Sequence, residues 1–236
     1  PEFNPFKYNS LPVHAARQSY RVTQDLQRRL SRLSRAGGLG DLPPVLTFQS
    51  VVDSTVSTDA VIRALHARLP AGRSELVLFD VNRSIHFGHL VSPAAARPAE
   101  ALLPPAPRGF AVTIVTNRDT SSSEVEARPE AAGSTDVAVR PLGLAFPEGV
   151  YSLSHIALPF PLTDSLYGLE PDPPHAFGAS LGAMATRGER GVLAVPSDDL
   201  ARMSSNPFFG YLVERLHETL ADRGPAAVPS PVDMAK

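Results

Sequence analysis

Two residues of this sequence stand where acid–base chemistry could be carried out. Asp53 follows a short apolar run, PVLTFQ (44–49), and His155 lies in SLSHIALPF (152–160), where prolines restrict the backbone. A histidine titrates near neutral pH and can take a proton from a serine hydroxyl, and a carboxylate can orient its ring. The plainer alternatives are that Asp53 hydrogen-bonds its own loop and that His155 is a core residue.

Ser180 is a third residue with a catalytic pattern around it. The segment GASLG (178–182) matches the G-x-S-x-G turn that presents a serine nucleophile between a strand and a helix. The preceding EPDPPHAF contains three prolines and no apolar run, so no strand leads into this turn. In hydrolases with this turn the serine also precedes the acid and the histidine. We therefore do not expect Ser180 to be a nucleophile, although a complete small hydrolase built on it stays a hypothesis.

Metal and cofactor chemistry have little support in the sequence. His86 and His89 are three residues apart, but no carboxylate accompanies them at helical spacing. The chain has no cysteine, which excludes disulfides, a thiol nucleophile and a Cys-ligated zinc. Lys7 and Lys236 are the only lysines. No segment calls for a nucleotide or a flavin, so we expect no cofactor.

The elements around Asp53 form the best-defined part of the predicted architecture. Residues 44–49 and 75–81 are apolar and β-rich, and residues 57–68 begin with a Ser/Thr cap and carry a helical apolar face. Strand, helix and strand over this length predict a βαβ unit with parallel strands and a right-handed crossover. Asp53 would then lie just beyond the carboxyl end of the first strand, where sites of open parallel sheets form.

The rest of the chain gives weaker signals. An amphipathic helix is predicted over 14–35, with Val22, Leu26, Leu30 and Leu33 on one face and mostly arginines opposite. Strands are predicted over 109–116 and 149–158, and polar residues 117–133 are expected to be exposed. A last helix is predicted over 208–221, with Phe209, Leu212, Val213, Leu216 and Leu220 on its apolar face. Glu189, between Arg187 and Arg190, is expected in a surface or structural ion pair.

Composition limits the class of protein. The 236 residues are 43% hydrophobic, enough for a sizeable core, and their net charge of −2 does not favour a nucleic-acid partner. No apolar run approaches the 18 residues of a membrane span, and no signal peptide is evident at the start. The 24 prolines are about twice the usual share of roughly 5%. They separate segments that otherwise have the character of ordered elements.

Taken together, several segments resemble the C-terminal half of bacterial α/β-hydrolase-fold proteins, the lysophospholipase-like or carboxylesterase-like serine hydrolases. These segments are PEFNPFKYNSLPVHAARQ, PPVLTFQSVVDSTVS, ELVLFDVNR, VYSLSHIALPFPLTDSLYG and RGERGVLAVP. The resemblance covers about residues 1–220 and is most specific around Asp53 and His155. It implies an α/β fold with an open, mostly parallel sheet flanked by helices. It also implies a Ser–Asp–His triad that hydrolyses carboxylic esters, lipid esters or lysophospholipids among them.

In that family Asp53 matches the acid and His155 the base. The usual nucleophile turn and several strands would precede Asp53, and the 52 residues before it have no room for them. We therefore expect an α/β-hydrolase-like domain over 1–223, with an insertion at about 84–148 and a flexible tail at 224–236. The serine would lie upstream, so residues 1–236 alone would be inactive. The missing N-terminal half of the same protein would be its partner.

Two further expectations complete this interpretation. We expect a small-molecule ester substrate and a cytoplasmic location, with no membrane span. The alternative from a different class is a non-catalytic α/β-hydrolase-like binding module, in which Asp53 is a plain loop cap and His155 a core residue.

Overall fold

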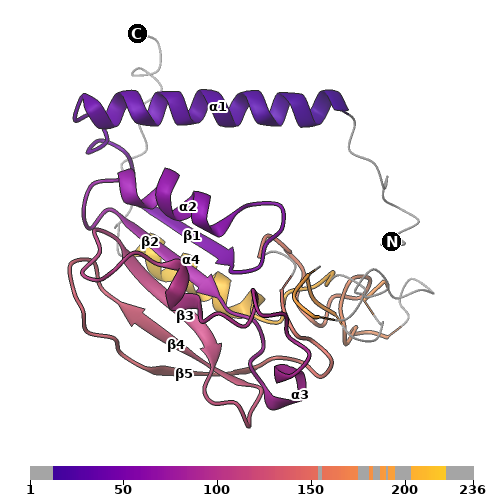
Figure 1. Ribbon diagram of the computed structural model, residues 1–236. Coiled ribbons are helices and arrows are strands. Elements are labelled where there is room, and N and C mark those ends of the chain that lie inside the picture. The colour runs from indigo at the N-terminus through magenta and orange to yellow at the C-terminus, as the bar shows by residue number, and fades with distance from the viewer. Residues whose placement is uncertain are drawn as a thin grey trace.

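A five-stranded mixed sheet organises the molecule, and its strands follow one another across it in chain order. The computed structural model describes residues 13–153, 156–174, 181–182, 187–189, 191–194 and 203–221. The strands are β1 (Val45–Ser50), β2 (Ser74–Phe79), β3 (Ala111–Asn117), β4 (Glu124–Glu130) and β5 (Arg140–Ala145). The first three are parallel, and β4 and β5 extend the sheet in antiparallel fashion. The chain therefore has an α/β fold (Figure 1).

The predicted βαβ unit is confirmed. Strands β1 and β2 pair in parallel from Val45 opposite Ser74 to Ser50 opposite Phe79. Helix α2 (Thr58–Ala64) connects them and continues into the 3-10 turn η1 (His66–Arg68). Ser57 caps α2, because its side chain accepts a hydrogen bond from the Ala60 N–H. The carboxyl ends of β1, β2 and β3 thus meet at one edge of the sheet.

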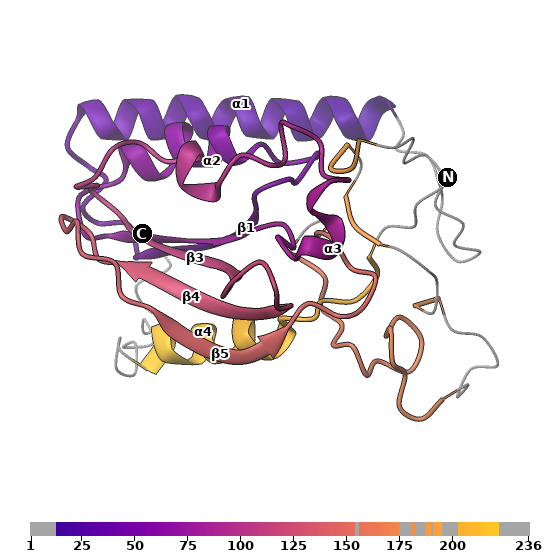
Figure 2. The ribbon, with the colours of Figure 1, turned by 60° about the horizontal axis from the view of Figure 1, so that its bottom comes forward.

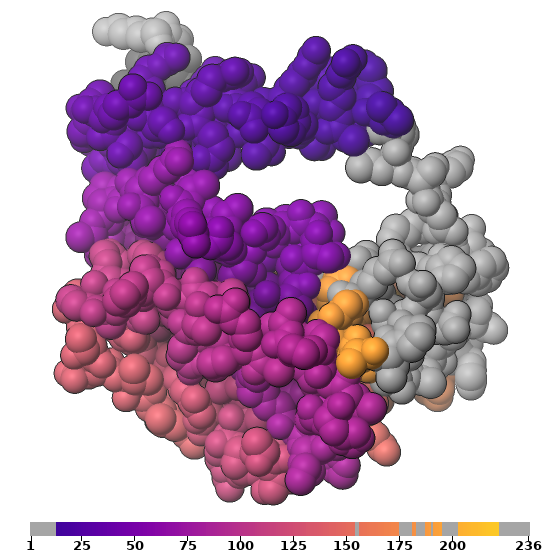
Figure 3. All heavy atoms as spheres, viewed as in Figure 1, coloured from indigo at the N-terminus to yellow at the C-terminus, as the bar shows by residue number. Residues whose placement is uncertain are grey.

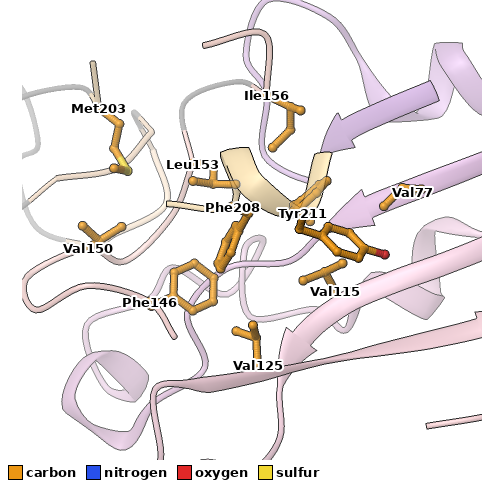
Figure 4. Packing of buried hydrophobic residues seen from close by; sticks show 11 residues of the cluster. Val77, Val115, Val125, Phe146, Val150, Leu153, Ile156, Met203, Phe208 and Tyr211 are labelled. Atoms are coloured by element: carbon orange, nitrogen blue, oxygen red, sulfur yellow. The ribbon is translucent and has the colours of Figure 1, made fainter. Parts of the chain in front are cut away.

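Helices cover the two faces of the sheet. Helix α4 (Phe209–Ala221) lies on one face, whereas α2 and the 3-10 turn η2 (Ala99–Leu102) lie on the other (Figure 2). Strand β2 is buried on both sides: Val77 and Phe79 pack with Phe208 and Tyr211, and Leu76 and Leu78 pack toward α2. Such a strand has a continuous apolar run, as ELVLF shows. Figure 4 shows the α4-side cluster, in which Phe208 and Tyr211 approach the strand residues.

The antiparallel strands differ from the sequence expectation. Residues 117–133 were expected to be exposed, but they contain β4, in which Val125, Glu126 and Ala127 are buried. Strands β3, β4 and β5 all lie within 84–148, the range expected as an insertion, and all three belong to the sheet. The polar composition of β4 does not predict a strand. Its charged residues are accommodated in the sheet because they are paired, as Glu126 is with Arg128.

Residues 149–158 do not form the expected strand where the structure describes them. Val150 makes a single parallel bridge with Arg187, and Val150, Tyr151 and Leu153 are buried without a neighbouring strand. Their backbone groups bond to side chains and loops instead, as the next section describes. Apolar residues in this run predict burial correctly, but the pairing partner decides whether buried chain is a strand.

The two long helices pack differently from each other. Helix α1 (Val13–Arg35) forms as predicted, and of its residues only Leu30 is buried. On α4 the predicted apolar face is partly wrong, because Leu216 is 46% and Leu220 61% exposed. The helix instead packs through Tyr211, Leu212 and Arg215, together with Phe208 just before it. The Arg215 guanidinium binds Glu75 of β2 at 2.8 Å. A short helix α3 (Ile85–Gly88) lies between β2 and β3.

Candidate active site at the carboxyl edge of the sheet

Asp53 lies in the loop directly after β1, as predicted. Its Oδ1 accepts hydrogen bonds from the N–H groups of Thr55 (2.7 Å) and Val56 (2.9 Å), and its own N–H donates to Ser50 O. These hydrogen bonds hold the turn of the loop that leads into α2. The residue is half-buried. Among the described residues no donor reaches its second oxygen, Oδ2, so one carboxylate oxygen stays open to a further partner.

The segment that leads to His155 lies beside the Asp53 loop. Ser50 Oγ donates to Leu153 O at 3.1 Å, and Asn82, just after β2, donates through its side chain to Val150 O at 2.8 Å. Ile156 is buried in the α4-side core. The chain on both sides of 154–155 is therefore anchored near the carboxyl ends of β1 and β2. His155 itself lies outside the described residues, as does Ser180, so their geometry stays a prediction.

A second carboxylate, Glu189, is buried next to the same loop. Ser54 Oγ donates to Glu189 Oε1 at 3.2 Å, and the Glu189 N–H donates to Ser152 Oγ at 2.7 Å. Glu189 and Arg187 are each only 1% exposed, so a surface location for this pair of residues is wrong. Gly188 between them is needed, because a side chain there would collide with the Tyr151 ring and Ser152.

Burial alters the ionisation of the groups around Glu189. The pKa of Tyr151 is raised to about 12, chiefly because burial disfavours the phenolate and also because the negative charge of Glu189 opposes it. Burial lowers the pKa of the Arg187 guanidinium. Tyr151 is therefore a neutral hydrogen-bonding group at physiological pH and not a base.

A buried polar network joins the ends of β2 and β3, and the sequence analysis did not identify it. Asp80 accepts hydrogen bonds from Thr116 Oγ1 (2.9 Å) and from Arg83, whose Nη2 lies 2.8 Å from Oδ1. Asn117 Oδ1 accepts from the Arg83 N–H, and its amide donates to Asn82 Oδ1. The available signal was the polar residues that directly follow two apolar strands. Each carboxylate oxygen of Asp80 has partners, so this network holds the edge in shape.

The histidines in the described part of the chain do not form a metal site. No group of three His, Asp or Glu side chains comes together there. His66 is buried between Ser74 Oγ and Thr47 Oγ1, each 3.0 Å from a ring nitrogen, and burial lowers its pKa to about 4. It packs away from the Asp53 loop, against Phe110. His66 is a neutral structural residue.

Comparison of the chain with protein-family models, with curated proteins and with solved structures finds no match. No helix in the described part of the chain is both long and apolar enough to cross a bilayer. What the site can do chemically therefore depends on its own geometry. Asp53 offers an open carboxylate oxygen at the carboxyl edge of a parallel sheet, beside an anchored segment whose next residues include a histidine.

Proposed function

We propose that these residues form the acid and histidine part of a Ser–His–Asp site for ester hydrolysis, on an α/β-hydrolase-like sheet. The observation that carries the proposal is the hydrogen bond between Ser50 and Leu153. It ties the end of β1, after which the Asp53 loop begins, to the chain two residues before His155, and this supports a site at the carboxyl edge, where parallel α/β sheets form their sites.

Each residue has a defined role in the proposal. His155 takes the proton of a serine hydroxyl as it attacks the ester carbonyl, and then returns the proton to the leaving alcohol. Asp53 fixes the tautomer of His155 and stabilises the imidazolium. The serine and its oxyanion hole come from polypeptide outside residues 1–236. The substrate class is carboxylic esters, with lipid esters and lysophospholipids as the first to test, and no cofactor takes part.

Asp53 is a better acid for this role than Asp80, although both follow parallel strands. Asp80 is 3% exposed and its carboxylate is occupied by Arg83, Thr116 and the Val81 N–H. An imidazole would have to displace the guanidinium to reach it. The Oδ2 of Asp53 has no such competitor among the described residues, while its Oδ1 bonds orient the carboxylate.

A second candidate function is a non-catalytic binding module. The observation in its favour is that Asp53 already serves as a loop cap through Oδ1. A capping role alone explains this geometry without any histidine. The two candidates differ in what happens when the carboxylate is replaced by an amide.

The test uses a longer polypeptide, in which residues 1–236 are preceded by the residues encoded upstream of them. It measures hydrolysis of p-nitrophenyl butyrate. We expect Asp53→Asn and His155→Ala to lower kcat by about a thousandfold or more. The matched controls are Asp59→Asn and His217→Ala, at exposed positions of α2 and α4, which should change kcat less than about twofold. Full activity in both Asp53→Asn and His155→Ala would reject the proposal.

A second measurement uses residues 1–236 alone with a fluorophosphonate probe. No serine should be labelled, because the proposed nucleophile lies elsewhere. Labelling at Ser180 would instead support the complete small hydrolase.

A further inference from the structure

Helix α1 carries a strong positive charge in a chain whose net charge is −2. Its one acidic residue, Asp25, is paired with Arg28. Its arginines are Arg17, Arg21, Arg28, Arg29, Arg32 and Arg35. Arg28 and Arg32 are four residues apart, and Arg35 is three further on, so like charges are neighbours on the helix surface. Such pairs destabilise a helix unless an anion compensates them.

Three of these arginines, Arg28, Arg32 and Arg35, line a groove between α1 and η1. The groove has a volume of about 690 Å³, within the range of small-molecule sites. Its walls are Gln27, Arg28, Ser31, Arg32, Arg35, Ala36 and Arg68, with no acidic residue. Helix α1 lies apart from the sheet (Figure 1), and in the space-filling view its end that leads toward β1, which carries the groove residues, touches the rest of the molecule (Figure 3).

Arg68 is held in place across this groove. Its Nη1 donates to Gln27 Oε1 at 3.0 Å and to Ser31 Oγ at 2.9 Å, both on α1. The guanidinium of η1 is thereby fixed against the helix, facing the same space as the α1 arginines. This arrangement brings the charges of Arg32, Arg35 and Arg68 to one groove, beside Arg28, whose charge Asp25 compensates.

Two arginine side chains of α1 in the groove are available to a ligand. Arg32 is exposed, and its guanidinium makes no hydrogen bond or ion pair within the described part of the chain. Arg35 is also exposed and uses its Nε to bond Ser31 O at 3.1 Å. Arginine keeps its charge at all physiological pH values, so the groove stays cationic.

We propose that the groove between α1 and η1 binds an anion that carries more than one phosphate group. Guanidinium groups bind phosphate oxygens in planar, two-point fashion, and several phosphates would neutralise the three charges of Arg32, Arg35 and Arg68 together. The phosphates could belong to a soluble compound or to a lipid headgroup, and the chemistry of recognition is the same. No residue of the groove belongs to the Asp53 loop, so this inference goes beyond the proposed hydrolase function and is tested separately.

The experiment measures binding of sodium tripolyphosphate to the 236-residue chain by calorimetry at 0.1 M salt. We expect the double variant Arg32→Gln/Arg35→Gln to weaken binding about tenfold or more. The matched control, Arg17→Gln/Arg21→Gln, removes the same charge from the same helix away from the groove and should weaken binding less than about twofold. Circular dichroism verifies that both variants keep their helix, which glutamine favours nearly as well as arginine.

Further arms distinguish the source of the phosphates and the alternatives. Cosedimentation with phosphatidylglycerol vesicles but not phosphatidylcholine vesicles, lost in the groove variant, supports a lipid headgroup. Binding of tripolyphosphate without vesicle binding supports a soluble compound. Equal weakening in both double variants, or no binding of either probe, overturns the proposal. Tighter binding to a short DNA duplex, equally sensitive to both variants, also overturns it in favour of a nucleic-acid surface.

Discussion

At the scale of single residues, the interior of this protein treats its ionisable groups in two ways. His66 is buried without any charged partner: its ring nitrogens bond to hydroxyl groups on β1 and β2, and burial keeps the ring neutral. Asp80 is buried beside a charged partner, since Arg83 lies against it with Nε 2.5 Å from Oδ2. Burial of His66 makes the free energy of unfolding depend on pH, whereas burial of Asp80 makes it depend on the presence of Arg83.

We expect acid to destabilise the protein through His66. Its pKa is about 4 in the folded state against 6.5 in the unfolded chain, so its neutral form favours folding. This contribution is complete above pH 6.5 and is lost as the pH falls toward 4, by about 2 kcal/mol at pH 5. Urea unfolding at pH 7.5 and pH 5 measures it.

The variant His66→Gln should lose about 2 kcal/mol less stability than the wild type between those pH values, since its side chain does not titrate. His217→Gln, at an exposed position of α4, is the control and should behave as the wild type does. An unchanged pH dependence in His66→Gln would contradict the prediction.

Removing the partner of Asp80 should be far more damaging than removing an exposed arginine. Arg83→Met leaves a buried carboxylate without its guanidinium, which we expect to lower the free energy of unfolding by about 3 kcal/mol. Arg63→Met breaks the exposed pair with Asp59 on α2 and should change it by less than about 1 kcal/mol. Chemical denaturation of both variants compares them, and similar losses would show that the Asp80 network is not structural.

At the scale of elements, the two edges of the sheet are built differently. The β5 edge carries Arg140, Pro141 and an irregularity in its register with β4, features that discourage pairing with another chain. The β1 edge, VLTFQS, has no charge, proline or bulge. Val45 and Val51 donate to β2, so Leu46 and Phe48 direct their backbone groups outward. Within the described residues nothing hydrogen-bonds to those groups.

We expect the 236-residue chain to self-associate through the β1 edge. Leu46→Pro removes an N–H that points outward and makes no hydrogen bond to β2, so this variant should associate less. Sedimentation velocity over a tenfold concentration range measures the association. Leu46→Ala is the matched control, because it also loses packing of the leucine but leaves the edge open. Equal association in the two variants would show that β1 is not the contact.

At the scale of the whole molecule, α4 closes the core against a sheet made by chain far away in sequence. The ring centroid of Phe208 is 5.7 Å from that of Phe79 on β2, and 5.1 Å from that of Phe146 just after β5. Arg215 adds a two-point contact with Glu75. The last helix therefore ties together strands at the centre and at the edge of the sheet.

Truncation of the Phe208 side chain tests how much the packing of its ring contributes to the free energy of unfolding. Phe208→Ala removes a fully buried ring, and we expect a loss of about 3–5 kcal/mol in the free energy of unfolding. Leu216→Ala, at a position 46% exposed on α4, should lose less than about 1 kcal/mol. Thermal and urea unfolding measure both. Comparable losses would show that α4 packs through its other face.

The candidate site was predictable in part. Asp53 could be placed after a parallel strand because PVLTFQ, the cap at Ser57 and ELVLF are local signals that need no distant contact. The contact of Ser50 with Leu153 could not be predicted, since 103 residues separate them. The burial of Glu189 and the network of Asp80 with Asn117 were also missed, because charged and amide residues are ordinarily exposed unless a distant partner compensates them.

By itself, the sequence determined the elements with strong periodicity: helix α1, the βαβ unit and the existence of a last helix. Tertiary structure decided that the polar run 124–130 is a strand, that 150–153 is buried chain without a strand, and that α4 turns Tyr211 and Arg215 inward. The physical reason is the same in each case. Local periodicity sets which conformation a segment favours, but the groups that bury, pair or hydrogen-bond it come from distant parts of the chain.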